Sequence, residues 1–107
     1  MIHLLNTTII PATAPATFVA RGRTVTVEEA RELVADGFVS HIGHESTAQI
    51  FSEILGVPVP MDRRPWDASG VGLILQLNGR PPEGRILTRE EIESIGYTLR
   101  VMVISAA

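Results

Sequence analysis

The segment Val71–Leu77 constrains the fold most strongly, because it is an almost uninterrupted run of apolar residues. Only Gly72 and Gln76 depart from the pattern. A short run without a polar face is typical of a strand that is buried on both sides at the centre of a sheet. Such a strand needs other strands beside it and further elements over its faces. The rest of the chain must therefore supply both.

Three further segments have the periodicity and the boundary residues of helices. Thr26 and Thr88 each precede a glutamate by three positions, which predicts a capping box at the start of two helices. The third helix is predicted from Glu45 onward, where apolar residues recur at helical spacing: Ala48, Phe51, Ile54 and Leu55. A glycine follows each predicted helix and ends it: Gly37, Gly56 and Gly96.

The remaining apolar segments predict strands beside the central one. Short strands are expected at Ile2–Leu5, Phe18–Ala20 and Tyr97–Ile104, and Phe38–Ile42 is expected to be a strand or an extended lead-in to the Glu45 helix. Irregular structure is expected between them: a loop at 11–17, a turn at 21–23 and an exposed loop at 62–69. These elements predict a single α/β (α+β) domain spanning residues 1–107, with a mixed sheet of about four to five strands and about three helices.

Composition excludes several classes of protein. The chain of 107 residues contains no cysteine, so it has neither disulfides nor thiolate metal sites. Its net charge of −3 argues against a general DNA or RNA coat protein, because duplex binding depends on many contacts to phosphate. No apolar run is long enough to cross a membrane, and no secretion signal is recognisable at the N-terminus. We therefore expect a soluble, cytoplasmic protein without a membrane partner.

The residues at the start of the Glu45 helix have the chemistry of an anion site. Gly43 and His44 precede it, and Ser46 and Thr47 supply hydroxyl groups in its first turn. The first turn of a helix offers unpaired N–H groups and the positive end of the helix dipole, and histidine titrates near neutral pH. An anion site with a proton-transfer residue is one interpretation. The other is a plain helix cap with a surface histidine, and these local residues on their own favour it.

Three more groups of residues are candidates for chemistry. His41 and His44 could share a metal ion, but no third ligand is evident, so we expect no metal site and interpret His41 as a strand residue with a satisfied side chain. Arg80 and Glu83 lie in a proline-stiffened loop after the central strand, where an ordinary surface ion pair is the simpler interpretation.

The segment 62–64, Asp-Arg-Arg, could bind phosphate through its arginines, since arginine can form two hydrogen bonds to phosphate oxygens. Two adjacent arginines in a loop are weak evidence on their own. The neighbouring Trp66 could stack on a nucleobase, but packing in the protein is the simpler expectation.

Taken together, these residues resemble the viral ring nuclease family, the type III anti-CRISPR proteins of archaeal viruses and phages with cellular relatives. The similarity rests on the segments Phe38–Ala48, Val59–Arg63 and Gln76–Thr88, in this order and at compatible spacing. Leu4–Thr7 and Ile95–Tyr97 also resemble the family. Its most specific elements are Gly-His-Glu-x-Thr-Ala at 43–48 and Arg-x-x-Glu-Gly at 80–84.

The resemblance implies a homodimer that binds cyclic tetra-adenylate across its two-fold axis. It also implies cleavage without a metal or other cofactor, to linear di-adenylate with a 2′,3′-cyclic phosphate. The implied catalytic residues are His44, as general acid, and Glu83, as a base or an orienting group for the 2′-OH. The implied ligand-binding residues are Arg80, Arg63, Asn6, Thr7, Gly43, Ser46, Thr47, Gln76 and Gly84.

Two other classes of function stay open at this stage. One is a dimeric protein that binds or sequesters a cyclic nucleotide without cleaving it. The other is an interaction protein without a nucleotide site. DNA is not expected to be a substrate of the ring nuclease, because it lacks the attacking 2′-OH. The sequence does not reveal ring-size preference, or whether the source is a virus, a prophage or a cell.

Overall fold

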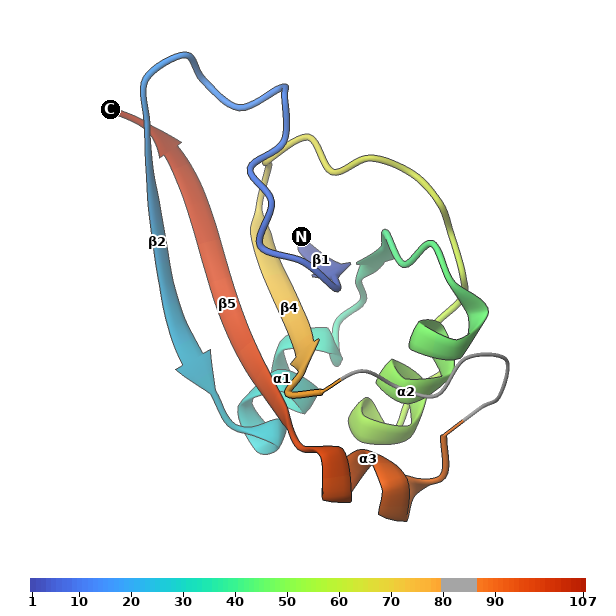
Figure 1. Ribbon diagram of the computed structural model, residues 1–107. Coiled ribbons are helices and arrows are strands. Elements are labelled where there is room, and N and C mark those ends of the chain that lie inside the picture. The colour runs from blue at the N-terminus through green and yellow to red at the C-terminus, as the bar shows by residue number, and fades with distance from the viewer. Residues whose placement is uncertain (80–86) are drawn as a thin grey trace.

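Five strands form one mixed sheet with the order β2–β5–β4–β1–β3 (Figure 1). The structure, a computed structural model, describes residues 1–79 and 87–107. β4 is the predicted central strand, and it pairs with parallel β1 on one side and with antiparallel β5 on the other. The strand bounds are Ile2–Leu5 for β1, Phe18–Val25 for β2, Val39–Ser40 for β3, Val71–Leu77 for β4 and Tyr97–Ala106 for β5.

The described residues form three helices: α1 at Val27–Val34, α2 at Glu45–Leu55 and α3 at Arg89–Ile95. Both predicted capping boxes are confirmed, because Thr26 and Thr88 accept from the amides of Glu29 and Glu91 while each glutamate side chain bonds back to the threonine amide. α2 ends as predicted at Gly56, whose φ of 72° is easily adopted only by glycine. None of the helices in the described part of the chain is long and apolar enough to cross a membrane.

The sheet separates two apolar clusters on its two faces. Leu4, Leu73 and Leu75 point toward the helices and form the main core with α2 residues such as Phe51, which is fully buried. The next residues along each strand point to the opposite face, where Leu5 and Ile74 pack with Trp66 from the 62–69 segment. The strand alternation therefore fixes which side chains share a face with α2.

The sequence predicted the fold class correctly and two local features wrongly. Residues 21–23 do not form a turn, because β2 continues through them and pairs with β5 from Phe18, opposite Ala106, to Val25, opposite Leu99. The 62–69 segment is not wholly exposed either, since Trp66 is only 6% exposed and Ala68 is buried as well. Figure 1 shows β2 and β5 as a long ribbon that extends beyond the helices.

The parallel strands β3, β1 and β4 all end at the same edge of the sheet. β3 leads through residues 41–44 into α2, and α2 leads back toward β4. In sheets of this kind, ligands usually bind outside the carboxyl ends of the strands. This edge is the place to look for a site, and we call it the carboxyl edge.

Candidate anion-binding site at the carboxyl edge

Several residues predicted to bind ligand lie at or next to the carboxyl edge. Asn6 and Thr7 directly follow β1, and both side chains are exposed. Gly43 and His44 lie between β3 and α2. The topology therefore brings together residues that are far apart in the sequence, as the predicted site requires.

His44 is the N-cap residue of α2, but its imidazole does not serve as the cap. The His44 backbone is extended, with φ −133° and ψ 133°, and its carbonyl accepts the first helical hydrogen bond from Ala48 at 3.0 Å. No side-chain capping bond forms at this helix start, and the His44 side chain is exposed. α1 and α3 both have capping boxes, whereas in the described part of the chain the N-cap side chain of α2 makes no hydrogen bond to the first turn, so the N–H groups there are candidates for binding an anion.

Arg63 is attached to the backbone immediately before His44. Its Nε and Nη2 donate to the Gly43 carbonyl at 3.3 and 2.8 Å. A Cβ at position 43 would lie 3.3 Å from Arg63 Nε, so the glycine allows the guanidinium to lie close to the backbone. The remaining nitrogen, Nη1, is not engaged by that carbonyl and can donate to an anion.

Asp62 does not neutralise Arg63. Its carboxylate pairs with Arg64 at 2.6 Å instead, and both of these side chains are partly exposed. The Asp62 amide donates to the Ile42 carbonyl at 2.9 Å, which fixes the 62–63 backbone beside the residues that precede α2. The acidic residue before Arg63 is therefore compatible with a positive charge at the site.

A cavity of about 200 Å³ joins the end of β1 to the first turn of α2. Asn6 and Thr47 contribute its polar side chains, and its walls are Ile50, Leu75 and Leu77. Thr47 is half-buried and Ser46 is exposed. Of the predicted binding residues, Asn6 and Thr47 are thus brought into one cavity.

Gln76 does not join this cavity. It lies between Leu75 and Leu77 on β4, so its side chain points to the opposite face of the sheet. There its Oε1 accepts from Arg100 Nη1 at 2.7 Å. Arg100 is an exposed cation that the sequence analysis did not single out, and its partnership with Gln76 depends on the β4–β5 register.

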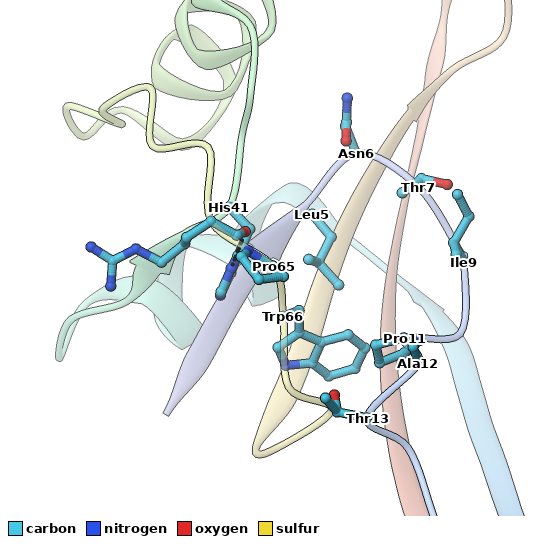
Figure 2. A pocket seen from close by; sticks show the side chains of 11 residues that line it. Leu5, Asn6, Thr7, Ile9, Pro11, Ala12, Thr13, His41, Pro65 and Trp66 are labelled. Carbon is cyan, nitrogen blue, oxygen red and sulfur yellow. Dashed lines mark hydrogen bonds between the residues drawn. The ribbon is translucent and has the colours of Figure 1, made fainter.

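A second cavity of about 330 Å³ lies on the side of the sheet opposite the helices, and Figure 2 shows the side chains around it. Trp66 lies across it, with Leu5, Ile9 and Pro11 nearby, so its lining is mainly apolar. Asn6 borders this cavity and the one at α2. The end of β1 therefore borders both cavities.

His41 lies beside the second cavity and is fully engaged. Its Nε2 is 2.8 Å from Nδ1 of His3, and its Nδ1 donates to the Arg64 carbonyl at 3.0 Å. The expectation of a satisfied side chain at His41 is confirmed, but His41 is not a strand residue, because β3 ends at Ser40. His3 was missed by the sequence analysis, because nothing in the local pattern indicates that β1 and the end of β3 place these rings in contact.

Three predicted site residues, Arg80, Glu83 and Gly84, lie outside the described residues. Within residues 1–79 and 87–107, no group of three or more histidine, aspartate or glutamate side chains is arranged to hold a metal ion. The chemistry available from the described residues is therefore that of an imidazole, a guanidinium, hydroxyl and amide groups, and helix N–H groups.

Fold and site together define a small α/β domain with a candidate site at the carboxyl edge of its parallel strands, where a cavity is lined by Asn6, Thr47 and three apolar side chains. Residues 2–99 match the family described as STIV B116-like, and the chain belongs to this family. It is 35% identical over 103 residues to protein 26 of Sulfolobus islandicus filamentous virus (isolate Iceland/Hveragerdi), covering 92% of this chain and 87% of the relative.

A second relative and a solved structure agree with this assignment. The chain is 33% identical over 105 residues to protein ORF117 of Acidianus two-tailed virus, with 92% and 89% of the two chains covered. Its fold is similar to that of B116 of Sulfolobus turreted icosahedral virus, with a TM-score of 0.79, 18% identity and coverage of 95% and 97%. The chain thus has the B116 fold and is similar to proteins of archaeal viruses.

Proposed function

We propose that this protein is a ring nuclease that opens cyclic tetra-adenylate, the second messenger of type III CRISPR immunity, without a metal ion. The products are linear di-adenylate molecules that end in a 2′,3′-cyclic phosphate. The observation that carries the proposal is the convergence of His44, Arg63 and the open first turn of α2 at one edge of the sheet. The sequence resemblance supplies the identity of the ligand.

The protein forms no covalent bond to the substrate in this reaction, because the nucleophile belongs to the substrate. The ribose 2′-oxygen attacks the adjacent phosphorus, the bond from phosphorus to the 5′-oxygen breaks, and that oxygen takes up a proton as it leaves. Holding the nucleophile in line is worth about 7–11 kcal/mol. An exposed imidazole at the start of α2 is suited to protonate the leaving oxygen, and we assign this role to His44, with an expected contribution of about 10²–10⁴-fold.

The other residues bind and orient the phosphate. Arg63 and the N–H groups of the first turn of α2 offset the negative charge that develops on the phosphoryl oxygens. Asn6 and Thr47 border the cavity beside that turn and are suited to hold ribose or phosphate oxygens. Arg80 is proposed as the principal phosphate ligand and Glu83 as the group that orients or deprotonates the 2′-OH.

The cavity that contains Trp66 is suited to accommodate a nucleobase of the bound nucleotide. The mainly apolar cavity that contains Trp66 shares Asn6 with the cavity at α2, so a nucleotide bound at Asn6 could extend its base toward it. We propose that two protomers each supply one such half-site, because a cyclic tetranucleotide can share the two-fold axis of a homodimer. Light scattering with and without ligand tests this oligomeric state.

The decisive experiment is incubation of the purified protein with cyclic tetra-adenylate in excess EDTA, followed by chromatography. Conversion to linear di-adenylate supports the proposal, whereas an intact ring that co-elutes with the protein indicates a nucleotide-sequestering protein. A ring that neither binds nor breaks indicates an interaction protein without this site. The matched control is the all-deoxy ring, which lacks the nucleophile and should stay intact.

A further inference from the structure

A pair of histidines, of which His3 is buried and His41 is half-buried, connects β1 to the segment that carries Arg63. His3 lies on β1 and is only 9% exposed, and its Nδ1 is 2.8 Å from Nε2 of His41. The two ring centroids are 5.0 Å apart. The second nitrogen of His41 bonds to the Arg64 carbonyl, so the pair forms a continuous link from His3 to the backbone next to Arg63.

The hydrogen bonds determine where the protons are. A carbonyl can only accept, so Nδ1 of His41 must carry the proton that it donates to Arg64. Nε2 of a neutral His41 is then an acceptor, and Nδ1 of His3 must be the donor in the bond between the rings. Nε2 of His3 takes no part in the bond between the rings and is the nitrogen of His3 that can accept a further proton.

This arrangement tolerates one additional proton but not two. With one, a single ring is an imidazolium and the other still offers an acceptor nitrogen, so the bond survives. With two, both facing nitrogens carry hydrogen and both rings are positive, so the bond is lost and the rings repel. The His41 ring, which donates to the Arg64 carbonyl, is then no longer held in place by its hydrogen bond to His3.

The charged groups around the pair act in opposite directions. Burial is the largest cause that lowers the pKa of His3, and the positive charges of His41 and of the N-terminal amine lower it further, whereas the Asp67 carboxylate raises it. The Asp67 side chain is itself bonded to Ser69. The guanidinium of Arg64 is paired with Asp62, so it adds little net charge beside His41.

The segment that the His41 bond holds, residues 62–64, carries Arg63 and is part of the candidate site. Besides the His41 bond, the 62–64 backbone is attached by the Asp62 amide to Ile42 and by the Arg63 side chain to Gly43. These two attachments lie beside His44, and the His41 bond closes the other end of the segment. Loss of the histidine link therefore frees the segment on the side of Arg64 and loosens Arg63.

We infer that His3 and His41 are positioning residues that hold the Arg63–Arg64 segment at neutral pH and release it when both rings are protonated. The part of this inference that concerns ligand affinity rests on the proposed function, because it requires Arg63 to bind the nucleotide. The release itself concerns the free protein. It can be tested whether or not the protein is a nuclease.

The test uses Trp66, which is the only tryptophan in the chain and lies with its ring centroid 6.2 Å from that of His3. Its fluorescence should change in a sigmoidal step as the pH falls below about 6.5, because a protonated imidazole quenches a nearby indole. Hydrogen exchange of the Asp62 and Arg64 amides, corrected for intrinsic rates, should become about tenfold faster at the acid end of this step, where the second ring is protonated and one hydrogen bond is lost.

Two variants separate this role from a merely structural one. His3→Asn retains a donor near the position of Nδ1 but does not titrate, so it should preserve slow exchange at neutral pH and abolish the acid step. His44→Gln removes the other histidine outside the pair and should leave the step unchanged. A flat wild-type titration, or an acid step that persists in His3→Asn, overturns the inference.

Ligand binding then distinguishes the inference from the proposed function. If the protein binds cyclic tetra-adenylate, its affinity should fall in acid by about tenfold more for wild type than for His3→Asn, as expected for one lost hydrogen bond. Equal falls in the two proteins contradict control of Arg63 by the pair. If it binds no ring at any pH, the proposed function fails, while the fluorescence and exchange results still decide whether the pair releases the segment.

Discussion

Ser52 offers the sharpest test of how the site is held together, because one hydroxyl group joins α2 to the chain that follows it. Its Oγ donates to the Ala48 carbonyl at 2.9 Å and accepts from the Val59 amide at 2.8 Å. Val59 is 7% exposed, so its amide has little access to water. Ser52→Ala removes the acceptor for that amide without changing the helix face.

The magnitude follows from two opposing effects. A buried N–H group left without an acceptor costs about 1–3 kcal/mol. Alanine has a higher helix propensity than serine, which offsets roughly 0.5 kcal/mol of this destabilisation. We expect Ser52→Ala to lower the free energy of unfolding by about 1–2 kcal/mol, measured as a lower urea midpoint with an unchanged m-value.

The matched control is Ser46→Ala, the same substitution in the same helix at an exposed position. It should change the free energy of unfolding by no more than about 0.5 kcal/mol. Equal midpoints for the two variants would refute the argument, since the bond to Val59 would then contribute nothing. A larger loss for Ser46→Ala would place the important hydroxyl at the start of the helix instead.

Three further predictions test the core, the site and the pH dependence. Phe51→Ala should cost about 3–5 kcal/mol in urea unfolding, because Phe51 is fully buried, and a loss below about 1 kcal/mol would contradict its place in the core. Arg63→Gln should weaken cyclic tetra-adenylate binding by about tenfold in calorimetry, whereas Arg64→Gln, at the side chain paired with Asp62, should not. Since the folded state lowers the pKa of His3, the unfolded chain takes up its proton first as the pH falls below 6.5, so the free energy of unfolding should decrease there and decrease less in His3→Asn.

Local sequence patterns predicted the elements that position the site. The capping boxes at Thr26 and Thr88, the glycine stop at Gly56 and the apolar run of β4 each depend on neighbouring residues, and each is found in the structure. Short-range physical chemistry was therefore enough to place α2 and the carboxyl edge from which His44 projects.

Features that depend on partners distant in the sequence were not predictable in the same way. Arg21-Gly22-Arg23 has the composition of a turn, but pairing with β5 keeps it in a strand. The packing expected for Trp66 is confirmed, but its place against Leu5 and Ile74, like the contact of His3 with His41, arises only when the 62–69 segment packs against the sheet. Sequence spacing could not indicate these contacts, because each one joins residues from separate elements.

The central claim is that His44 acts in the chemistry of ring opening and not in binding. The most direct measurement is single-turnover cleavage of cyclic tetra-adenylate by His44→Ala, alongside its dissociation constant for the same ring. The account predicts cleavage slower by at least about 10²-fold with affinity within roughly tenfold of wild type. Wild-type cleavage by the variant, or an equal loss of binding and rate, would contradict it.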